Sequence, residues 1–244
     1  MDINLTWLIV GFFGLSFGFQ LLVMVVPRTG YSKIFDNKQD DDVTYEKCAD
    51  HGRWMYTMLH FNWLRFVEYS ISGSLVLATI ALISGIVDTE LLICIFFLSA
   101  ACMIFGLVAE WCMRVHTVLV KGTVAIKQLP GGEVTSNILE RMLSRAFIVS
   151  HLMAWVCIAV PWYIIFKHYE SWFNQCKSNS QPPEFVKYIV FLQIVLFTSF
   201  GIIQAVQWKY PHKRRAAEIA YISLSLTAKA FLGIILAVNV LMQD

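Results

Sequence analysis

Residues 221–231 read Tyr-Ile-Ser-Leu-Ser-Leu-Thr-Ala-Lys-Ala-Phe and lie inside an apolar stretch that runs from Ala216 to Met242. A helix of this length is long enough to cross the hydrocarbon core of a bilayer, which is about 30 Å thick. The single lysine of the stretch, Lys229, is therefore expected at membrane depth. A charged side chain there costs at least about 2.5–3.5 kcal/mol on insertion scales and commonly marks a functional site. Lys229 is the first candidate for such a site.

The rest of the chain has the composition of an integral, multi-pass membrane protein. Of its 244 residues, 57% are hydrophobic and 15% are charged, whereas a soluble domain carries about 25% charged residues. We expect an all-α transmembrane bundle that forms one domain over residues 1–244. The first span lacks the basic start and cleavage site of a signal peptide. The six spans that we predict are Ile3–Val26, Tyr56–Val87, Leu91–Met113, Ala146–Phe166, Phe185–Trp208 and Ala216–Met242.

Basic residues predict the orientation of these spans. Fourteen of the 19 Lys and Arg residues lie in the connections after the first, third and fifth spans, and three lie in or beside the connections on the other face. The positive-inside tendency then places the basic loops in the cytoplasm and both termini outside. We predict a long loop over Arg114–Arg145, a tight turn at Asp88–Glu90, and a helical extension of the fourth span around Ile138–Leu143.

The second span supplies an acidic partner for the lysine. Glu68 lies 15 residues after Arg53, and Lys229 lies 14 residues after Arg215, so the two side chains reach nearly the same depth if both helices run the same way. Glu68 shares a helix face with Arg65 and Ser72, as Lys229 does with Ser225. The pair has two interpretations: a structural ion pair, or a lysine that forms a Schiff base with an aldehyde, balanced by a carboxylate.

A retinal site needs hydroxyl groups near the imine and aromatic walls along the polyene. The fourth span offers Trp162 after Pro161, and the fifth offers Phe197, Phe200 and Gln204. Aromatic side chains at helical spacing are more often ordinary packing, so these residues support a retinal pocket without establishing it.

Two long motifs resemble the heliorhodopsin family. Residues 65–72, Arg-Phe-Val-Glu-Tyr-Ser-Ile-Ser, are similar to that family's counterion helix, and residues 218–229, Glu-Ile-Ala-Tyr-Ile-Ser-Leu-Ser-Leu-Thr-Ala-Lys, are similar to its final helix. Weaker matches, in order along the chain, are Gly106 to Glu110, Pro161-Trp162, and Phe197 to Phe200 followed by Gln204 and Gln207.

The resemblance implies a photoreceptor of rhodopsin-like fold rather than an enzyme. It implies that all-trans retinal is bound to Lys229 as a protonated Schiff base with Glu68 as counterion, and that Ser225 is the neighbouring hydroxyl. It further implies a homodimer in the lipid bilayer and a cytoplasmic signalling partner. The residues expected to line the chromophore are Tyr69, Trp162, Phe197 and Gln204.

The sequence also departs from the family pattern. Heliorhodopsins have seven helices, and six are predicted here. The segment Gly14–Gln20 resembles the family's second helix, so the first is expected to be missing, either truly or because the chain is incomplete at its N-terminus. Gln20 stands where a histidine is common, and Ile219 replaces an arginine.

Other functions remain open or find no support. A light-gated ion or proton channel could use Glu110 or Glu218 along its path, although ordinary interfacial charge is the simpler interpretation of both. A chromophore-free six-helix protein could keep Glu68 and Lys229 as a structural pair. His60 and His151 are more simply packed or interfacial than proton relays. No zinc-type Cys/His spacing and no basic stripe for nucleic acid occurs in the sequence.

Overall fold

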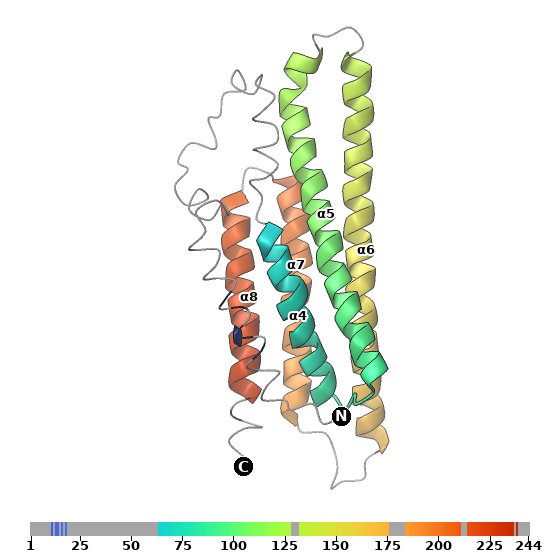
Figure 1. The fold of residues 1–244 in the computed structure, drawn as a ribbon, viewed down its shortest axis with the longest axis vertical. Coiled ribbons are helices and arrows are strands. Elements are labelled where there is room, and N and C mark those ends of the chain that lie inside the picture. Colours follow the sequence, from blue (N-terminus) through green and yellow to red (C-terminus); the bar gives the residue numbers. More distant parts are fainter. Residues whose placement is uncertain are drawn as a thin grey trace.

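The computed structural model describes residues 63–127, 132–175, 184–210 and 214–236, together with residues 11, 13, 14, 16, 18 and 238. Five long helices occupy these ranges, and each is long and apolar enough to cross a membrane. They pack side by side as an all-α bundle (Figure 1). The predicted first span, Ile3–Val26, lies largely outside the described residues. The helices are α4 (Trp63–Ile83), α5 (Thr89–Lys127), α6 (Gly132–Gln175), α7 (Glu184–Lys209) and α8 (Arg214–Leu236).

The α4–α5 connection is a tight turn whose hydrogen bonds satisfy the end of α4. Gly85 has a φ of 90°, its amide donates to the Leu82 carbonyl at 3.0 Å, and the Ile86 amide donates to the Ala81 carbonyl at 3.1 Å. This Schellman pattern requires a left-handed residue, which glycine adopts without strain. The predicted end of the second span at Val87 is therefore wrong, because Gly85 ends the helix earlier.

Asp88 lies just before the next helix and caps its first turn. Its carboxylate accepts a hydrogen bond from the Glu90 amide at 2.9 Å, and its carbonyl accepts one from Leu92 at 3.0 Å. An aspartate at this position satisfies an amide that the first helical turn leaves unpaired. The turn is thus as tight as predicted but lies just before Thr89 rather than at Asp88–Glu90.

Helices α5 and α6 are much longer than a bilayer is thick. With 39 and 44 residues, they measure about 58 Å and 66 Å at about 1.5 Å per residue. Both project past the other helices at the end where they are joined (Figure 1). The predicted loop over Arg114–Arg145 is therefore mostly helix, and both helices continue beyond the predicted span limits Met113 and Ala146. The helical extension predicted around Ile138–Leu143 is confirmed.

The remaining helix limits follow the predictions more closely. Helix α6 continues past Phe166 to Gln175 and contains Pro161 within it, while α7 matches the predicted fifth span within one residue at each end. Helix α8 begins at Arg214, two residues before the predicted start, and the predicted end at Met242 lies outside the described residues.

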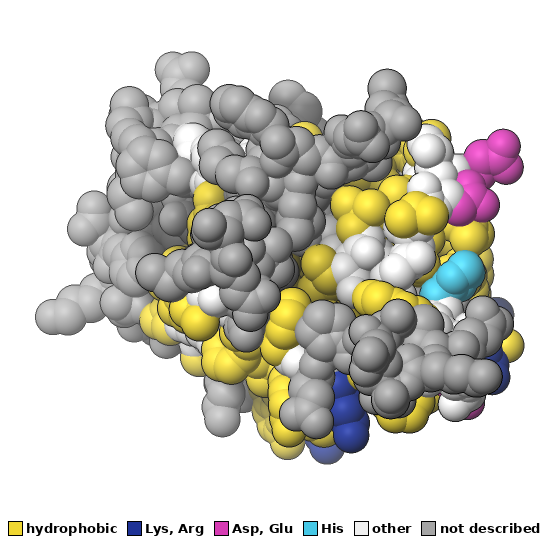
Figure 2. Space-filling view, turned by 90° about the horizontal axis from the view of Figure 1, so that it is seen from below, with side chains coloured by type: hydrophobic (Ala, Val, Ile, Leu, Met, Phe, Trp, Pro, Cys, Tyr) yellow, Lys and Arg dark blue, Asp and Glu magenta, His cyan; other side chains and the backbone are white. Residues whose placement is uncertain are grey.

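A large part of the interior is apolar, and so is most of the described surface. Leu77, Ile80, Ile95, Ile165 and Leu232 are fully buried in one cluster to which the five helices contribute. Large hydrophobic side chains are also exposed along α5, α6 and α7, and hydrophobic side chains dominate the described surface seen from the end of the bundle where α5 begins (Figure 2). Such a surface suits contact with lipid rather than water.

Helices α4 and α8 run in the same direction, as predicted, and α5 and α7 run against them (Figure 1). Helix α4 is the most enclosed of the five described helices. Its side chains can therefore meet polar groups from several neighbours at once, which is where the candidate site lies.

Candidate functional site

The lysine of α8 and the glutamate of α4 are in contact inside the bundle. Lys229 Nζ donates to Glu68 Oε1, and only 5% of Lys229 and 6% of Glu68 are exposed. Charged groups this deeply buried require partners, because an unpaired ammonium or carboxylate in an apolar interior is very costly. The expectation that the two side chains face each other at one depth agrees with this geometry.

Hydroxyl groups complete the surroundings of the amine and its carboxylate. Lys229 Nζ donates to Ser16 Oγ at 2.6 Å, and Ser16 Oγ donates to Glu68 Oε1 at 2.8 Å. Ser72, one turn after Glu68 on α4, donates to the same carboxylate oxygen at 3.0 Å. One oxygen of Glu68 therefore accepts three hydrogen bonds, which holds the carboxylate in one orientation. Ser225 is buried on α8, one turn before Lys229.

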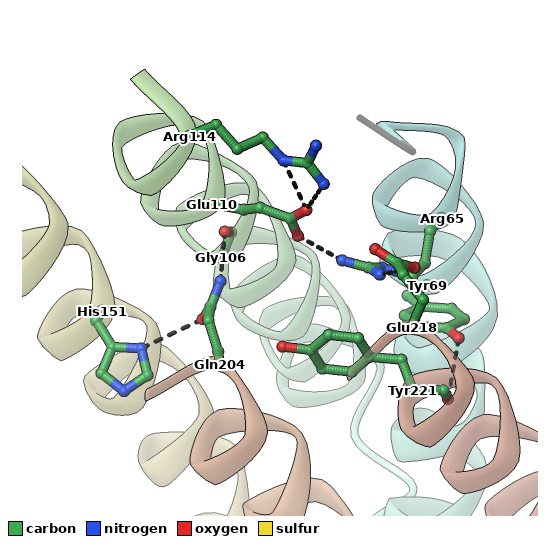
Figure 3. Close-up of polar contacts among 9 residues, drawn as sticks. All are labelled: Arg65, Tyr69, Gly106, Glu110, Arg114, His151, Gln204, Glu218 and Tyr221. Atoms are coloured by element: carbon green, nitrogen blue, oxygen red, sulfur yellow. Dashed lines mark hydrogen bonds and ion pairs between the residues drawn. The ribbon is translucent and has the colours of Figure 1, made fainter. Parts of the chain in front are cut away.

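A second charged cluster lies beside the first and was not expected from the sequence. Arg65 on α4 forms ion pairs with Glu110 on α5 and with Glu218 on α8, and Glu110 also pairs with Arg114. Arg114 Nε donates to Glu110 at 3.1 Å (Figure 3). Glu110 is 0% and Glu218 2% exposed. The interpretation of both as ordinary interfacial charges is wrong, because each is buried against a guanidinium.

Tyr221 joins this cluster to the first. Its ring lies under the Arg65 guanidinium, 4.3 Å from centroid to Cζ, and its carbonyl accepts a hydrogen bond from the Tyr69 hydroxyl at 3.3 Å. The Tyr69 ring in turn lies 5.5 Å from Lys229 Nζ. Cation–π contacts of this kind are worth about 2 kcal/mol or more when desolvated. The two tyrosines therefore connect the two buried cations.

A cavity of about 70 Å³ opens between all five described helices, next to Tyr69. Its walls are mainly apolar and aromatic, and its charged and polar side chains include Arg65, His151 and Gln204. Tyr69 contacts Phe200 edge to face, with centroids 5.7 Å apart, so the ring that contacts Lys229 is also a wall of the cavity. The lining residues are Arg65, Phe66, Tyr69, Cys102, Met103, Gly106, His151, Ala154, Trp155, Ile158, Phe197, Phe200, Gly201, Gln204 and Tyr221.

Comparison with known proteins identifies the family of this arrangement. The heliorhodopsin family model matches residues 56–241, which is more than half of the chain. The chain belongs to the heliorhodopsin family. A search among curated proteins found no match to the chain. As a heliorhodopsin, the protein is an integral membrane protein and a retinal-type photoreceptor in the broad sense.

The residues present fit a retinal in their chemistry. A retinal bound as a charged imine would need a primary amine, an acid to balance the charge and an apolar aromatic channel, and the chain brings Lys229, Glu68 and the Tyr69–Phe200 wall together. In size the fit is partial: ligand pockets usually measure about 300–1,000 Å³, against about 70 Å³ here. The cavity is therefore smaller than a ligand pocket of ordinary size.

The predicted site residues divide into three groups. Tyr69, Phe197 and Gln204 line the cavity. Trp162 does not line it but packs edge to face on Phe197, with centroids 5.8 Å apart. Lys229, Glu68 and Ser225 do not line it either, and Lys229 lies beyond the Tyr69 ring. Sequence reasoning missed Ser16 as a partner of the amine, although Ser16 lies within a segment that resembles a family helix. It also missed the roles of Glu110, Glu218 and His151, whose partners are distant in sequence.

Proposed function

We propose that this heliorhodopsin senses light with all-trans retinal attached to Lys229 as a protonated Schiff base, and that Glu68 is the counterion. Condensation joins the lysine nitrogen to the aldehyde carbon and releases the aldehyde oxygen as water, while the nitrogen retains a proton. The observation that carries the proposal is the contact of Lys229 with Glu68 beside an aromatic cavity. When bound, the retinal supplies light absorption and photoisomerisation.

The residues of the chain would hold the charge of the site in place. Glu68 is oriented by Ser16 and Ser72 through hydrogen bonds of 2.8 Å and 3.0 Å, so a cationic nitrogen at Lys229 keeps a fixed anionic partner. The buried Ser225 is the hydroxyl that the resemblance assigns to the same region. Tyr69, Phe197 and Gln204 are proposed to line the chromophore, with Trp162 supporting Phe197 from behind.

A conformational signal, rather than ion pumping, is the proposed output. Within the described residues, Glu68 is the carboxylate that contacts Lys229. The face of α4 that carries Glu68 has no clear second carboxylate that would accept a proton and pass it on. Such a site changes local charge and packing and passes the change to the rest of the fold. An unknown cytoplasmic partner would read the change.

A column of aromatic rings supports this output, because it leads from the cavity toward the long α5–α6 extension. Its successive centroid distances are 6.1 Å from Trp155 to His151, 5.6 Å from His151 to Phe147, 4.2 Å from Phe147 to Trp208, and 4.9 Å from Trp208 to His116. His116 lies 3.8 Å from Glu140 of the α6 extension. Rings are therefore packed against one another from the cavity wall to the end of the bundle that the basic residues predict to be cytoplasmic. A movement of the wall can pass along these contacts.

The decisive test is to add all-trans retinal to the purified protein. We expect a visible absorption band in the wild type and in Lys167→Ala, and none in Lys229→Ala. Lys167 is a suitable control because its side chain is 54% exposed and pairs only with its helix neighbour Glu170 among the ion pairs of the described residues. A band that survives Lys229→Ala, or no band in the wild type, would refute the retinal proposal and leave the structural ion pair as the better interpretation.

The counterion is tested separately by Glu68→Gln. Removing the negative charge beside a protonated imine should shift the band to longer wavelength, because the excited-state charge shift is no longer opposed by a nearby anion. It should also leave less of the imine protonated at neutral pH, since an opposite charge favours the charged form. Glu90→Gln, at an exposed position of α5, should change neither. If Glu68→Gln leaves the band and its titration unchanged, Glu68 is not the counterion.

A light-gated channel on the same chromophore is the alternative output. Glu110 and Glu218 would lie on its path, but both are buried in ion pairs with Arg65, so opening would have to break those pairs. Photocurrent in a voltage-clamped cell would favour the channel, and its absence with a normal photocycle would favour the sensor.

A further inference from the structure

Three polar side chains form a hydrogen-bond chain across the α6–α7–α5 side of the cavity. Trp155 Nε1 donates to His151 Nε2 at 3.0 Å, His151 Nδ1 lies 3.2 Å from Gln204 Oε1, and Gln204 Nε2 donates to the Gly106 carbonyl at 2.7 Å. Figure 3 shows the His151–Gln204–Gly106 part of this chain, drawn from three helices. All four residues line the cavity.

The direction of the chain is fixed by its two ends. The indole nitrogen of Trp155 can only donate, and the carbonyl of Gly106 can only accept. His151 Nε2 must therefore accept and carry no proton, so His151 Nδ1 carries the proton and donates to Gln204. In this arrangement the imidazole is neutral and is held as a single tautomer. A neutral ring held in this way fits a histidine at membrane depth.

Packing fixes the same rings in position. The imidazole of His151 stacks on Phe147, with centroids 5.6 Å apart and planes 10° apart. The Trp155 indole lies directly on Gly201 of α7: a Cβ at Gly201 would lie 2.5 Å from Trp155 Cζ2. Real Cβ atoms do not approach side chains this closely, so only glycine lets the indole reach its place in the wall.

We propose that His151 is a positioning residue for the chromophore, which acts by holding Trp155 and Gln204 in the cavity wall. The proposal rests on the proposed function, because it assumes that the retinal occupies this cavity. In this role, one ring nitrogen of His151 orients Trp155 and the other orients Gln204. The absorption maximum then depends on both hydrogen bonds, not only on the bulk of the histidine.

Two substitutions separate the two halves of the chain. His151→Gln places an amide near the Nε2 position and can still accept from Trp155, whereas His151→Asn places an amide near the Nδ1 position and can still donate to Gln204. Trp155→Phe keeps a ring but removes the indole donor. We expect His151→Asn and Trp155→Phe each to shift the band, and the double variant to shift it no further than one of them, because both remove the same hydrogen bond.

His151→Gln keeps the bond from Trp155 but removes the bond to Gln204, so its shift should add to that of Trp155→Phe. Combined with Gln204→Leu, it should shift the band no further than one of those two single variants, because both remove the same hydrogen bond. His168→Asn, at an exposed position later on α6, should leave the band unchanged. Additive shifts of His151→Asn and Trp155→Phe, or shifts no larger than that of His168→Asn, would overturn the proposal. If a His151 variant fails to fold, Trp155→Phe and Gln204→Leu still report on each bond.

A second measurement needs no retinal. In protein labelled with ¹⁵N-histidine, the signal that disappears in His151→Asn should be that of a neutral ring protonated on Nδ1. A charged ring, or a proton on Nε2, contradicts the hydrogen-bond chain whatever the chromophore does. Absence of a band in the wild type would instead overturn the retinal proposal and the chromophore role of His151 with it, so the two failures are distinguishable.

Discussion

The charge balance of the Arg65 cluster predicts how its variants differ in stability. Two guanidinium groups, of Arg65 and Arg114, face two carboxylates, of Glu110 and Glu218, so the cluster is neutral as a whole. Glu218→Leu leaves one uncompensated positive charge among groups that are almost fully buried. Removing one partner of a buried pair costs about 3–5 kcal/mol, or roughly two to four orders of magnitude in the unfolding equilibrium at about 1.4 kcal/mol per tenfold change.

The double variant Arg65→Met with Glu218→Leu should be more stable than Glu218→Leu alone. It removes one charge of each sign and leaves the Arg114–Glu110 pair, so the remaining cluster is again neutral. Replacing a buried pair with apolar side chains of similar volume is often neutral or stabilising. The double change should therefore cost clearly less than the sum of its two single changes.

The measurement is SDS-induced unfolding of the purified protein in mixed micelles, followed by tryptophan fluorescence. The matched control is Lys167→Met with Glu170→Leu, a pair whose side chains are 54% and 46% exposed and whose loss should cost at most about 1 kcal/mol. If Glu218→Leu costs no more than Glu170→Leu, or if the double variant is as unstable as the sum of its singles, the argument from charge balance is refuted.

Two glycine predictions follow from the close approaches in the structure. Gly85→Ala should destabilise the protein by about 1–2 kcal/mol, because Gly85 has a φ of 90° and an added Cβ would lie 3.0 Å from the Trp172 ring. Gly73→Ala, in the interior of α4 with open space around its Cβ, should instead stabilise the protein by up to about 1 kcal/mol. Equal SDS midpoints for the two variants would contradict this prediction. Gly201→Ala should displace Trp155, shift the retinal band and leave the Lys229 linkage formed; an unchanged band would show that the indole can move without affecting the chromophore.

The sequence was a good guide to whatever depends on apolar length and helical period. It predicted the membrane class, the all-α bundle and the limits of α7, because a bilayer requires about 20 apolar residues per helix. It also placed Lys229 and Glu68 at one depth from counts along two parallel helices. These features are local to one helix, or follow from two helices that run the same way.

It was a poor guide where helices leave the membrane. The stretch Arg114–Arg145 was assigned to a loop because charged residues interrupt its apolar pattern, yet α5 and α6 continue through much of it. A helix that extends into water needs no long apolar run, so hydropathy cannot mark its end. The end of α4 was missed for a similar reason: Gly85 is a strong stop signal, but it lies within an apolar sequence.

Glu110 and Glu218 show why the buried cluster could not be found from sequence. Each lies near the end of a predicted span, where a charged residue usually faces water. Their burial depends on Arg65, which is 45 residues from Glu110 and 153 from Glu218. No pattern within one helix shows that a third helix brings a guanidinium to both.

The two charged clusters also fix how α4 and α8 are placed along each other. Helix α4 offers Arg65 and Glu68, which are about 4.5 Å apart along the axis, while α8 offers Glu218 and Lys229, which are about 16.5 Å apart. The difference of about 12 Å is bridged because the Arg65 and Lys229 side chains are long and helical side chains lean toward the helix N-terminus. Each basic residue therefore reaches back to an acid on the other helix. A slip of α8 by one turn along α4 would leave at least one buried cation without its partner. The two ion pairs between these helices therefore select a single register, and this register places Lys229 against Glu68.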